Sequence, residues 1–191
     1  MRKVKRLTGQ LDDWLRKNRL HPLKSVAVFM LITLAIHFCW RFWAYQLHYF
    51  PIREAMRSAG DFMAGVVFVQ SAWFVEHVLN MKISTHSCTI QFAANNGTLT
   101  INSGCSGLKQ FAQFALLMML YPGPWKHKLW YIPVGIAIVH LTNLFRITGL
   151  SIVLVEWPRH WDFSHDYLFR PFFYVVIFLM WVIWEEKFRK K

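Results

Sequence analysis

Cysteine is scarce in this sequence, with only 3 residues among 191. Three cysteines are too few to hold a small secreted domain together by disulfides, so that class of fold is excluded. Acidic residues are also few, with 10 Asp and Glu against 22 Lys and Arg, which gives a formal net charge of +12. The basic residues gather mostly at the two ends of the chain, a distribution typical of membrane topology signals and lipid headgroup contacts. Nucleic acid is therefore not an expected partner.

Internal repeats and a cleavable signal peptide are also missing. The first long apolar run starts at Leu23 and ends in Cys39-Trp40-Arg41-Phe42-Trp43, not in the small residues that a signal peptidase requires. We interpret this run as a retained membrane anchor. Hydrophobic residues, in contrast, make up 55% of the chain and lie in long blocks. This pattern predicts an all-α polytopic membrane protein with four to five membrane helices.

The blocks indicate one membrane domain over residues 23–191, preceded by a basic cytoplasmic or interfacial arm over residues 1–22. A segment at residues 62–79 is apolar but contains Gln70, Glu76 and His77. The other apolar blocks are predicted helices at 23–43, 108–121, 129–155 and 168–184.

Lysine and arginine in short loops mark the cytoplasmic side of a membrane. By this rule the N-terminal arm, the predicted loop at Lys126-His127-Lys128 and the C-terminal tail are all cytoplasmic. Four spans satisfy this if residues 62–79 lie along the outer surface or only dip into the membrane, whereas five spans require an inverted N-terminus. The four-span topology agrees better with the charges and places residues 83–105 outside the cytoplasmic (inner) membrane.

Residues 83–105 are rich in Thr, Ser, Ile and Asn, and they predict a small extracytoplasmic β-hairpin. Asn96-Gly97 is a strong signal for a two-residue turn. Counting outward from this turn pairs Phe92 with Ile101, and Cys88 with Cys105, on one apolar face. Cα atoms ~4.5 Å apart would be compatible with a disulfide that masks Cys105. The alternative is that Cys88 is a small apolar residue packed on the helices.

Cys105 is the leading candidate for chemistry. It lies between two glycines in the segment NSGCSGLK (residues 102–109), at a predicted strand-to-helix turn. Unpaired backbone N–H groups and the positive end of the helix dipole favour a thiolate there and can hold an oxyanion. A buried structural cysteine at a loop corner is the alternative.

Arg146 is the second candidate, because it lies within an otherwise apolar helix. A charge at such a depth costs ~3 kcal/mol on insertion scales and indicates function by default. Counting from Leu129 at a rise of ~1.5 Å per residue places Arg146 ~26 Å along the helix, near the outer interface. Snorkelling to that interface is therefore the alternative explanation.

His165 joins Cys105 and Arg146 by topology. Cys105 and His165 each precede an inward-going helix, and Arg146 lies near the end of an outward-going one, so all three should meet at the outer face. A thiol, an imidazole and a guanidinium form an acyl-transfer set of nucleophile, general acid/base and oxyanion stabiliser. Asp166 either orients His165 or is a simple helix N-terminal acid.

The other histidines show no metal-site spacing. His127, His140 and His160 are too dispersed, together with His165, to predict a zinc site, and no metal or cofactor is expected. His140 lies inside a predicted helix, where an interhelical hydrogen bond is the expected role.

The sequence resembles the exosortase/archaeosortase family over about residues 83–184. The resemblance is carried by GCSGLK (residues 104–109), by Asn143-Leu-Phe-Arg-Ile, and by His165 before a final helix. Members are multi-pass membrane proteins of bacteria and archaea regarded as cysteine transpeptidases. The resemblance implies that Cys105 is the nucleophile, Arg146 the electrostatic stabiliser and His165 the general acid/base.

The resemblance also implies a class of partner. Family members act, at the outer face of the cytoplasmic membrane, on secreted proteins that carry a C-terminal motif, a membrane helix and a basic tail. This chain is shorter than the longer exosortases, and it has Lys109 where many members have arginine. No oligomeric state is predicted.

Two alternative functions remain open. The segment GCSG (residues 104–107) also fits the Gly-x-Ser-Gly pattern of a rhomboid-type serine peptidase, with Ser106 as nucleophile and His140 as its partner, although rhomboids have six helices. The chain could instead be a non-enzymatic membrane subunit of an envelope or polysaccharide assembly. Cys105 and Arg146 would then be structural.

Overall fold

The structure, a computed structural model, describes residues 21–189. Its main helices are α2 (His21–Tyr45), α3 (Arg53–His77), α4 (Leu108–Leu120), α5 (Trp125–Glu156) and α7 (Arg170–Trp184). Between α3 and α4 lie the strands β1 (Ile83–His86), β2 (Thr89–Phe92) and β3 (Thr98–Thr100), then a short 3₁₀ turn, η1 (Ser103–Cys105). Short helical segments precede and follow α7: η2 (Pro158–His160), α6 (Trp161–Phe163), η3 (Ser164–Phe169) and η4 (Glu185–Arg189). The predicted basic arm at residues 1–22 lies almost wholly outside the described residues.

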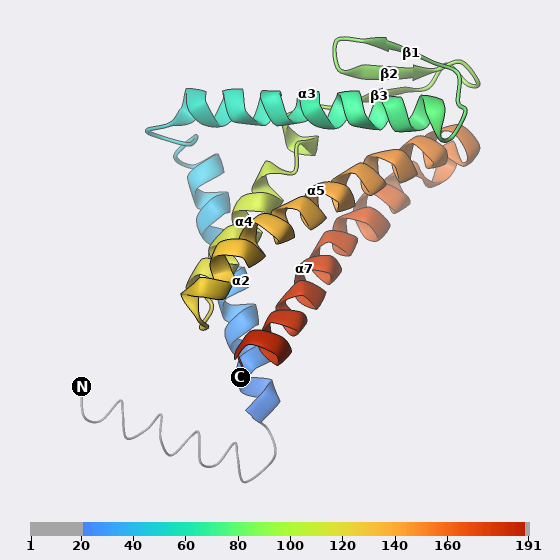
Figure 1. Cartoon of the computed structure of the whole chain (residues 1–191). Helices are drawn as coiled ribbons and strands as arrows, with labels where there is room; N and C mark the ends of the chain where they lie inside the picture. Colours follow the sequence, from blue (N-terminus) through green and yellow to red (C-terminus); the bar gives the residue numbers. More distant parts are fainter. Residues whose placement is uncertain (1–20, 190–191) are drawn as a thin grey trace, which may run out of the picture.

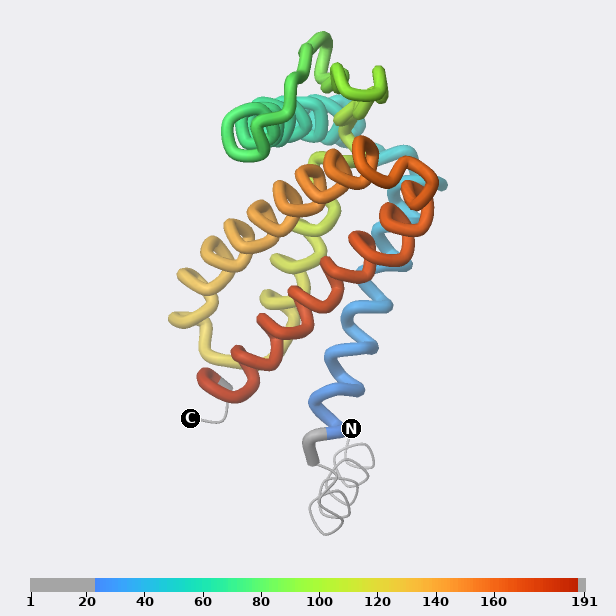
Figure 2. The backbone as a smooth tube through the Cα atoms, turned by 90° about the vertical axis from the view of Figure 1, so that its right-hand side faces the viewer, coloured from blue at the N-terminus to red at the C-terminus, as the bar shows by residue number. Residues whose placement is uncertain are grey.

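The helices α2, α4, α5 and α7 form a bundle, and α3 lies across one end of it (Figure 1). Figure 2, turned by 90°, shows the same arrangement, with the sheet beyond α3. We call this end of the bundle the α3 end. The start of α2 and the end of α7 both lie at the opposite end (Figure 1).

Four described helices are long and apolar enough to cross a membrane: Leu23–Tyr45, Arg53–His77, Trp125–Glu156 and Pro158–Phe188. This confirms the predicted class of polytopic helical membrane protein. The helix α3 meets the criterion of length and composition, yet it runs across the others (Figure 1). The 13-residue helix α4 rises only ~20 Å but lies along α2 and α5. This arrangement favours the four-span topology with residues 62–79 along the surface.

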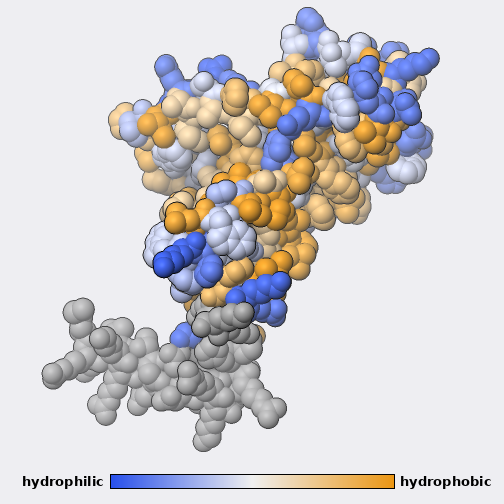
Figure 3. All heavy atoms as spheres, viewed as in Figure 1, coloured by the Kyte–Doolittle hydropathy of each residue, from blue (hydrophilic) through white to orange (hydrophobic). Residues whose placement is uncertain are grey.

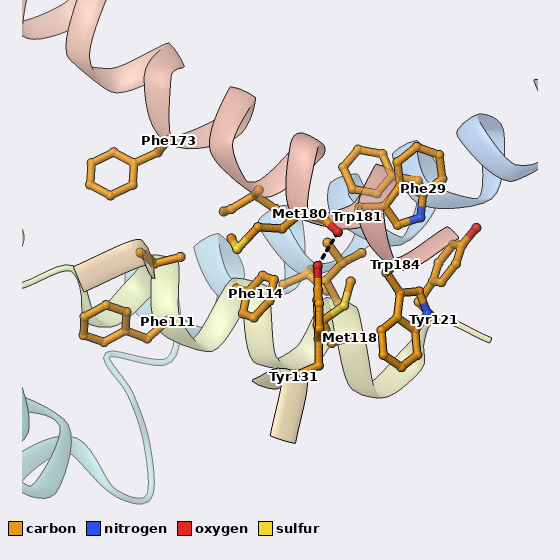
Figure 4. Close-up of a cluster of buried hydrophobic side chains, with 14 residues drawn as sticks. Phe29, Phe111, Phe114, Met118, Tyr121, Tyr131, Phe173, Met180, Trp181 and Trp184 are labelled. Carbon is orange, nitrogen blue, oxygen red and sulfur yellow. Dashed lines mark hydrogen bonds between the residues drawn. The ribbon is translucent and has the colours of Figure 1, made fainter. Parts of the chain in front are cut away.

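Aromatic side chains fill the bundle. Gly135 of α5 allows Phe114 of α4 to approach closely, because a Cβ at position 135 would lie 2.0 Å from the Phe114 Cε1 atom. The hydroxyl of Tyr131 donates a hydrogen bond to the carbonyl of Met180 at 2.6 Å (Figure 4). The large rings buried here include Phe29, Phe111, Phe114, Tyr121, Tyr131, Phe173, Trp181 and Trp184.

A second apolar cluster lies between α3, α5 and the sheet. It joins Val67 and Val75 of α3 to Ile147 of α5 and to Ile90 of β2. The outer surface of the sheet is polar, whereas apolar side chains cover much of the bundle (Figure 3). The sheet therefore rests on the helices through one apolar face, as the sequence predicts.

The predicted hairpin is in fact a three-stranded antiparallel sheet of order β1-β2-β3. Its two-residue turn is Ser87-Cys88, where both residues have positive φ (44° and 59°) and His86 pairs with Thr89. Such a turn matches the twist of the flanking strands. Asn96-Gly97 instead lies in a longer loop between β2 and β3.

The predicted pairing across that loop is wrong by four residues, because Ile90 faces Leu99 and not Ser103. The side chain of Asn95 explains the difference. Its Oδ1 accepts from Gly97 N at 2.9 Å, and its Nδ2 donates to the Leu154 carbonyl of α5 at 2.7 Å. An even shift leaves every side chain on its predicted face, which is why the buried face survives the error.

The predicted pairing of Cys88 with Cys105 fails with the register. The carbonyl of Cys88 accepts from Ile101 N at 2.9 Å, and both cysteines are free. The disulfide mask is therefore not present. Cys88 occupies the tight turn between β1 and β2, not a site opposite the candidate nucleophile.

The predicted basic loop at residues 126–128 is instead the first turn of α5. Lys128 is buried, and its ammonium donates to the carbonyls of Met119 at 3.0 Å and Tyr121 at 2.7 Å. These carbonyls lie at the C-terminal end of α4, where backbone acceptors lack intrahelical partners. Burial of Lys128 is favourable because its ammonium provides hydrogen-bond donors for these carbonyls.

Candidate active site

The segment that carries Cys105 is a single tight turn between β3 and α4. Asn102 shapes it, since its Oδ1 accepts from Gly104 N at 2.9 Å and its carbonyl accepts from Cys105 N at 2.8 Å. The thiol is half-buried at the start of α4, as predicted for a strand-to-helix turn. Helix α3 lies directly against this turn, and a Cβ at Gly60 would lie 3.0 Å from the Cβ of Ser103.

Ser106 and Gly107 connect the turn to α4. The Ser106 hydroxyl donates to the Ser103 carbonyl at 2.7 Å and accepts from Leu108 N at 3.2 Å, and the residue is only 1% exposed. Gly107 has a φ of 79°, and a Cβ there would lie 3.2 Å from the Asn143 amide nitrogen. Both positions therefore serve the geometry of the turn.

One face of α5 holds the turn in place and continues the site. Asn143 and Arg146 are three residues apart, so their side chains lie on the same side of the helix. The Asn143 amide donates to the Cys105 carbonyl at 2.7 Å, and Asn143 is fully buried. The buried Arg146 donates from Nη2 to His165 Nε2 at 3.0 Å. The Asn-x-x-Arg pair thus links the cysteine turn to the histidine.

His165 lies in η3, between α6 and α7. Its Nδ1 is 2.8 Å from Asp166 Oδ1, and its ring stacks on Trp161 with centroids 6.0 Å apart. A guanidinium can only donate, so Nε2 accepts from Arg146 and carries no proton. Nδ1 then carries the proton and donates it to Asp166. His165 is therefore neutral in this arrangement.

Electrostatics connect Cys105 to the same group. The Arg146 guanidinium lies within electrostatic range of Cys105, Asp166 and Arg170. Arg170 Nη2 also contacts Asp166 Oδ1 at 3.0 Å, so one carboxylate oxygen serves both the histidine and this arginine. The structure thus brings the three predicted residues to one place, with Arg146 touching His165 directly. Within residues 21–189, no hydrogen bond joins the Cys105 thiol to His165.

The model of the transmembrane exosortase family matches residues 20–184. The chain belongs to this family. The match covers most of the chain, including every residue of the site, three complete candidate spans and the fourth as far as Trp184. No curated protein and no solved structure shows significant similarity to this exosortase.

The geometry of the exosortase argues against the serine-peptidase alternative. His140 Nε2 lies 2.7 Å from Gln70 Oε1 of α3, which confirms the predicted interhelical hydrogen bond. Ser106 has its hydroxyl engaged twice within the backbone of its own turn. Neither residue is presented to the other, so they do not form a nucleophile–base pair.

Asn102 and Asn143 hold the cysteine turn, although neither is among the residues predicted from the sequence to act at the site. The Asn-x-x-Arg spacing in the family motif could have identified Asn143, because this residue lies three positions before Arg146. Asn102 could have been identified as an Asn that accepts from the N–H two residues on, a common way to begin a tight turn. Of the two roles that the sequence leaves open for Asp166, the structure supports the orienting one through its contact to His165.

Proposed function

We propose that this exosortase is a membrane-embedded cysteine peptidase or transpeptidase. Cys105 is the nucleophile, Arg146 stabilises the oxyanion and His165 is the general acid/base. The observation that carries the proposal is the face of α5, where Asn143 holds the cysteine turn and Arg146 holds His165. A purely structural arginine would not need an imidazole with its own carboxylate partner.

The contact between Arg146 and His165 orders the first steps. The Cys105 proton moves to His165 Nε2, with Asp166 supporting the imidazolium that forms. The single lone pair of Nε2 accepts from Arg146 before the transfer, so the guanidinium must leave Nε2 as the proton arrives. The released Arg146 is then free to donate to the substrate carbonyl oxygen as negative charge develops there.

The remaining steps follow from the same groups. The thiolate adds to the scissile carbonyl carbon, and the tetrahedral oxyanion is held by Arg146. Collapse breaks the C–N bond, the leaving amine takes the proton from His165 Nε2, and a thioester to Cys105 remains. Water or an acceptor amine then gives its proton to His165 and displaces the thiol, which regains its proton. Hydrolysis and transfer differ only in this last nucleophile.

We place the site at the outer face of the cytoplasmic membrane. The ends of the described chain and the start of α5, whose first turn contains Lys126, lie at the end of the bundle opposite the site (Figure 1). This fits basic segments retained in the cytoplasm. The substrates are secreted proteins with a C-terminal motif, a membrane helix and a basic tail. Such a helix would bring the scissile bond to the level of Cys105.

Substituting Cys105 tests the proposal. Cys105→Ala should abolish processing of a secreted substrate that has a C-terminal helix and then a Lys/Arg tail. Immunoblots of membranes measure the processing. Cys88→Ala is the matched control, because Cys88 is also half-buried and lies in the neighbouring sheet. Ser106→Ala should keep substantial activity, with a weakened start of α4. Full processing by Cys105→Ala would exclude the cysteine mechanism.

A further inference from the structure

A cationic cleft lies beside the candidate active site, at the α3 end of the bundle. Its volume is about 770 Å³, and its charged lining residues are Arg41 of α2 and Lys109 of α4, with Phe38, Phe42 and Tyr45 also lining it. Arg41 is one turn from the end of α2, and Lys109 is the second residue of α4. Both charges therefore lie near helix ends, close to the boundary of the membrane-spanning region.

The cleft has no negative charge to balance it. None of its lining residues within the described chain is acidic, and neither Arg41 nor Lys109 has a carboxylate partner among residues 21–189. Arg41 lies over the Tyr45 ring at 5.9 Å. Lys109 is within electrostatic range of both Arg41 and Arg170, so like charges face one another. Cations gathered in a partly desolvated cleft favour an anionic ligand.

The cationic cleft adjoins a second cleft that reaches the turn carrying Cys105. The second cleft, of about 640 Å³, shares Tyr45 and Lys109 with the first and extends to Ser103 and Gly104. Gly104 directly precedes Cys105. A ligand held by Lys109 would therefore lie next to the turn that carries the thiol.

Apolar side chains continue from the cationic cleft along α2. Phe38 lines the cleft, and Leu34 and Leu31 follow on the same face at spacings of four and three residues. The three are 61%, 51% and 68% exposed, respectively. A ligand with an anionic head and a long apolar tail matches both features. A peptide carboxylate would match only the charges.

We propose that Arg41 and Lys109 bind the phosphate of a phospholipid headgroup whose acyl chains lie along Phe38, Leu34 and Leu31. Basic pockets between membrane helices are suited to phospholipid headgroups. The guanidinium of Arg41 offers a fork that matches two phosphate oxygens, and the ammonium of Lys109 adds a point charge. The lipid would form one wall of the approach to Cys105. This site does not depend on the proposed peptidase activity.

The test uses the full chain in dodecyl maltoside micelles and dioctanoyl phosphatidylglycerol as the probe. Native mass spectrometry measures the number of bound lipid molecules and their Kd. The double variant Arg41→Gln/Lys109→Gln should raise the Kd by roughly tenfold or more, because two charge-assisted contacts are lost. The matched control, Lys82→Gln/Lys126→Gln, removes two exposed lysines away from the cleft and should change the Kd by less than about twofold. Cys105→Ala should bind like the wild type, which separates binding from chemistry.

Three further probes identify the ligand. Dioctanoylglycerol lacks the phosphate and should bind at least ~10-fold more weakly; equal binding would overturn the proposal. Inorganic phosphate or an acidic peptide that binds the cleft as tightly as the lipid, and displaces it, would assign the site to a free anion or to a substrate carboxylate. An equal loss in the control double variant would also contradict the proposal. If the glutamine variant does not fold, Arg41→Lys/Lys109→Arg keeps the charges and must retain binding.

Discussion

The two ends of the bundle are stabilised in different ways. At the end of the bundle opposite α3, aromatic rings from four helices interlock. The buried carboxylate of Glu185 accepts hydrogen bonds there, one oxygen from Ser25 at 2.7 Å and the other from Tyr121 at 2.9 Å. At the α3 end, polar side chains join the elements. Among the described residues, buried polar atoms without a partner there include Oδ1 of Asn143, Nε of Arg146, Oγ of Ser71 and Nδ1 of His140, whereas the aromatic cluster has Nε1 of Trp181. Buried polar atoms are normally satisfied. The α3 end therefore retains hydrogen-bonding capacity for a substrate, at some cost in stability.

The largest effect that would test this contrast concerns Arg146. Arg146→Ala should lower kcat/KM for a substrate peptide by ~10²–10³-fold, the usual cost of losing an oxyanion donor. Arg146→Lys should fail nearly as badly, because a point ammonium cannot reproduce the planar fork of the guanidinium. Steady-state kinetics of the purified exosortase measures both. Arg159→Ala, an exposed arginine near the same end, is the control and should stay within about twofold of the wild type. A fully active Arg146→Lys variant would indicate a snorkelling charge.

The opposite end can be disturbed through Gly135. Gly135→Ala places a methyl group against the Phe114 ring and should lower the free energy of unfolding by ~1–3 kcal/mol, while activity per folded molecule is unchanged. Gly65→Ala in α3 is the matched control, because nothing lies within 4 Å of a Cβ there. That change should stabilise the helix by ~0.5–1 kcal/mol. Thermal unfolding in detergent micelles compares the two variants; equal midpoints would show that the aromatic packing tolerates the methyl group.

A smaller effect is expected at Asp166. Asp166→Asn keeps an oxygen that accepts from His165 Nδ1 but removes the charge that supports the imidazolium, so kcat should fall by about tenfold with little change in KM. Asp166→Ala should fall further because the ring loses its orienting contact. Asp162→Asn, an exposed acid one turn earlier, provides the control. Equal kcat values for Asp166→Asn, Asp166→Ala and the wild type would reduce Asp166 to a helix N-terminal acid.

The helices and the cysteine turn could be predicted because they depend on the residues within and beside each segment. The apolar blocks gave the helices to within a few residues for α2 and α4, and the Gly-Cys-Ser-Gly turn lies between strand and helix as expected. The meeting of Cys105, Arg146 and His165 followed from topology, because three element ends at one side of a membrane have little room to separate. That prediction needed the order of the helices but not their packing.

The errors arose where a distant partner decides the structure. The β2–β3 register depends on Asn95 bonding to Leu154, 59 residues away in the sequence, and a count outward from Asn96-Gly97 cannot include that contact. The start of α5 depends on Lys128 reaching the last carbonyls of α4. Contacts between residues that are distant in the sequence form only when the chain folds, so a local sequence pattern cannot predict them.

The contact between Gly60 and the cysteine turn has an evolutionary consequence. Gly60 has no reactive group and lies 45 residues before Cys105, yet any larger side chain there would press on Ser103 and displace the turn. Selection for activity should therefore restrict this position as strongly as it restricts residues with chemistry. Descendants of a common ancestor should keep glycine at this point of α3 while the exposed residues around it diversify.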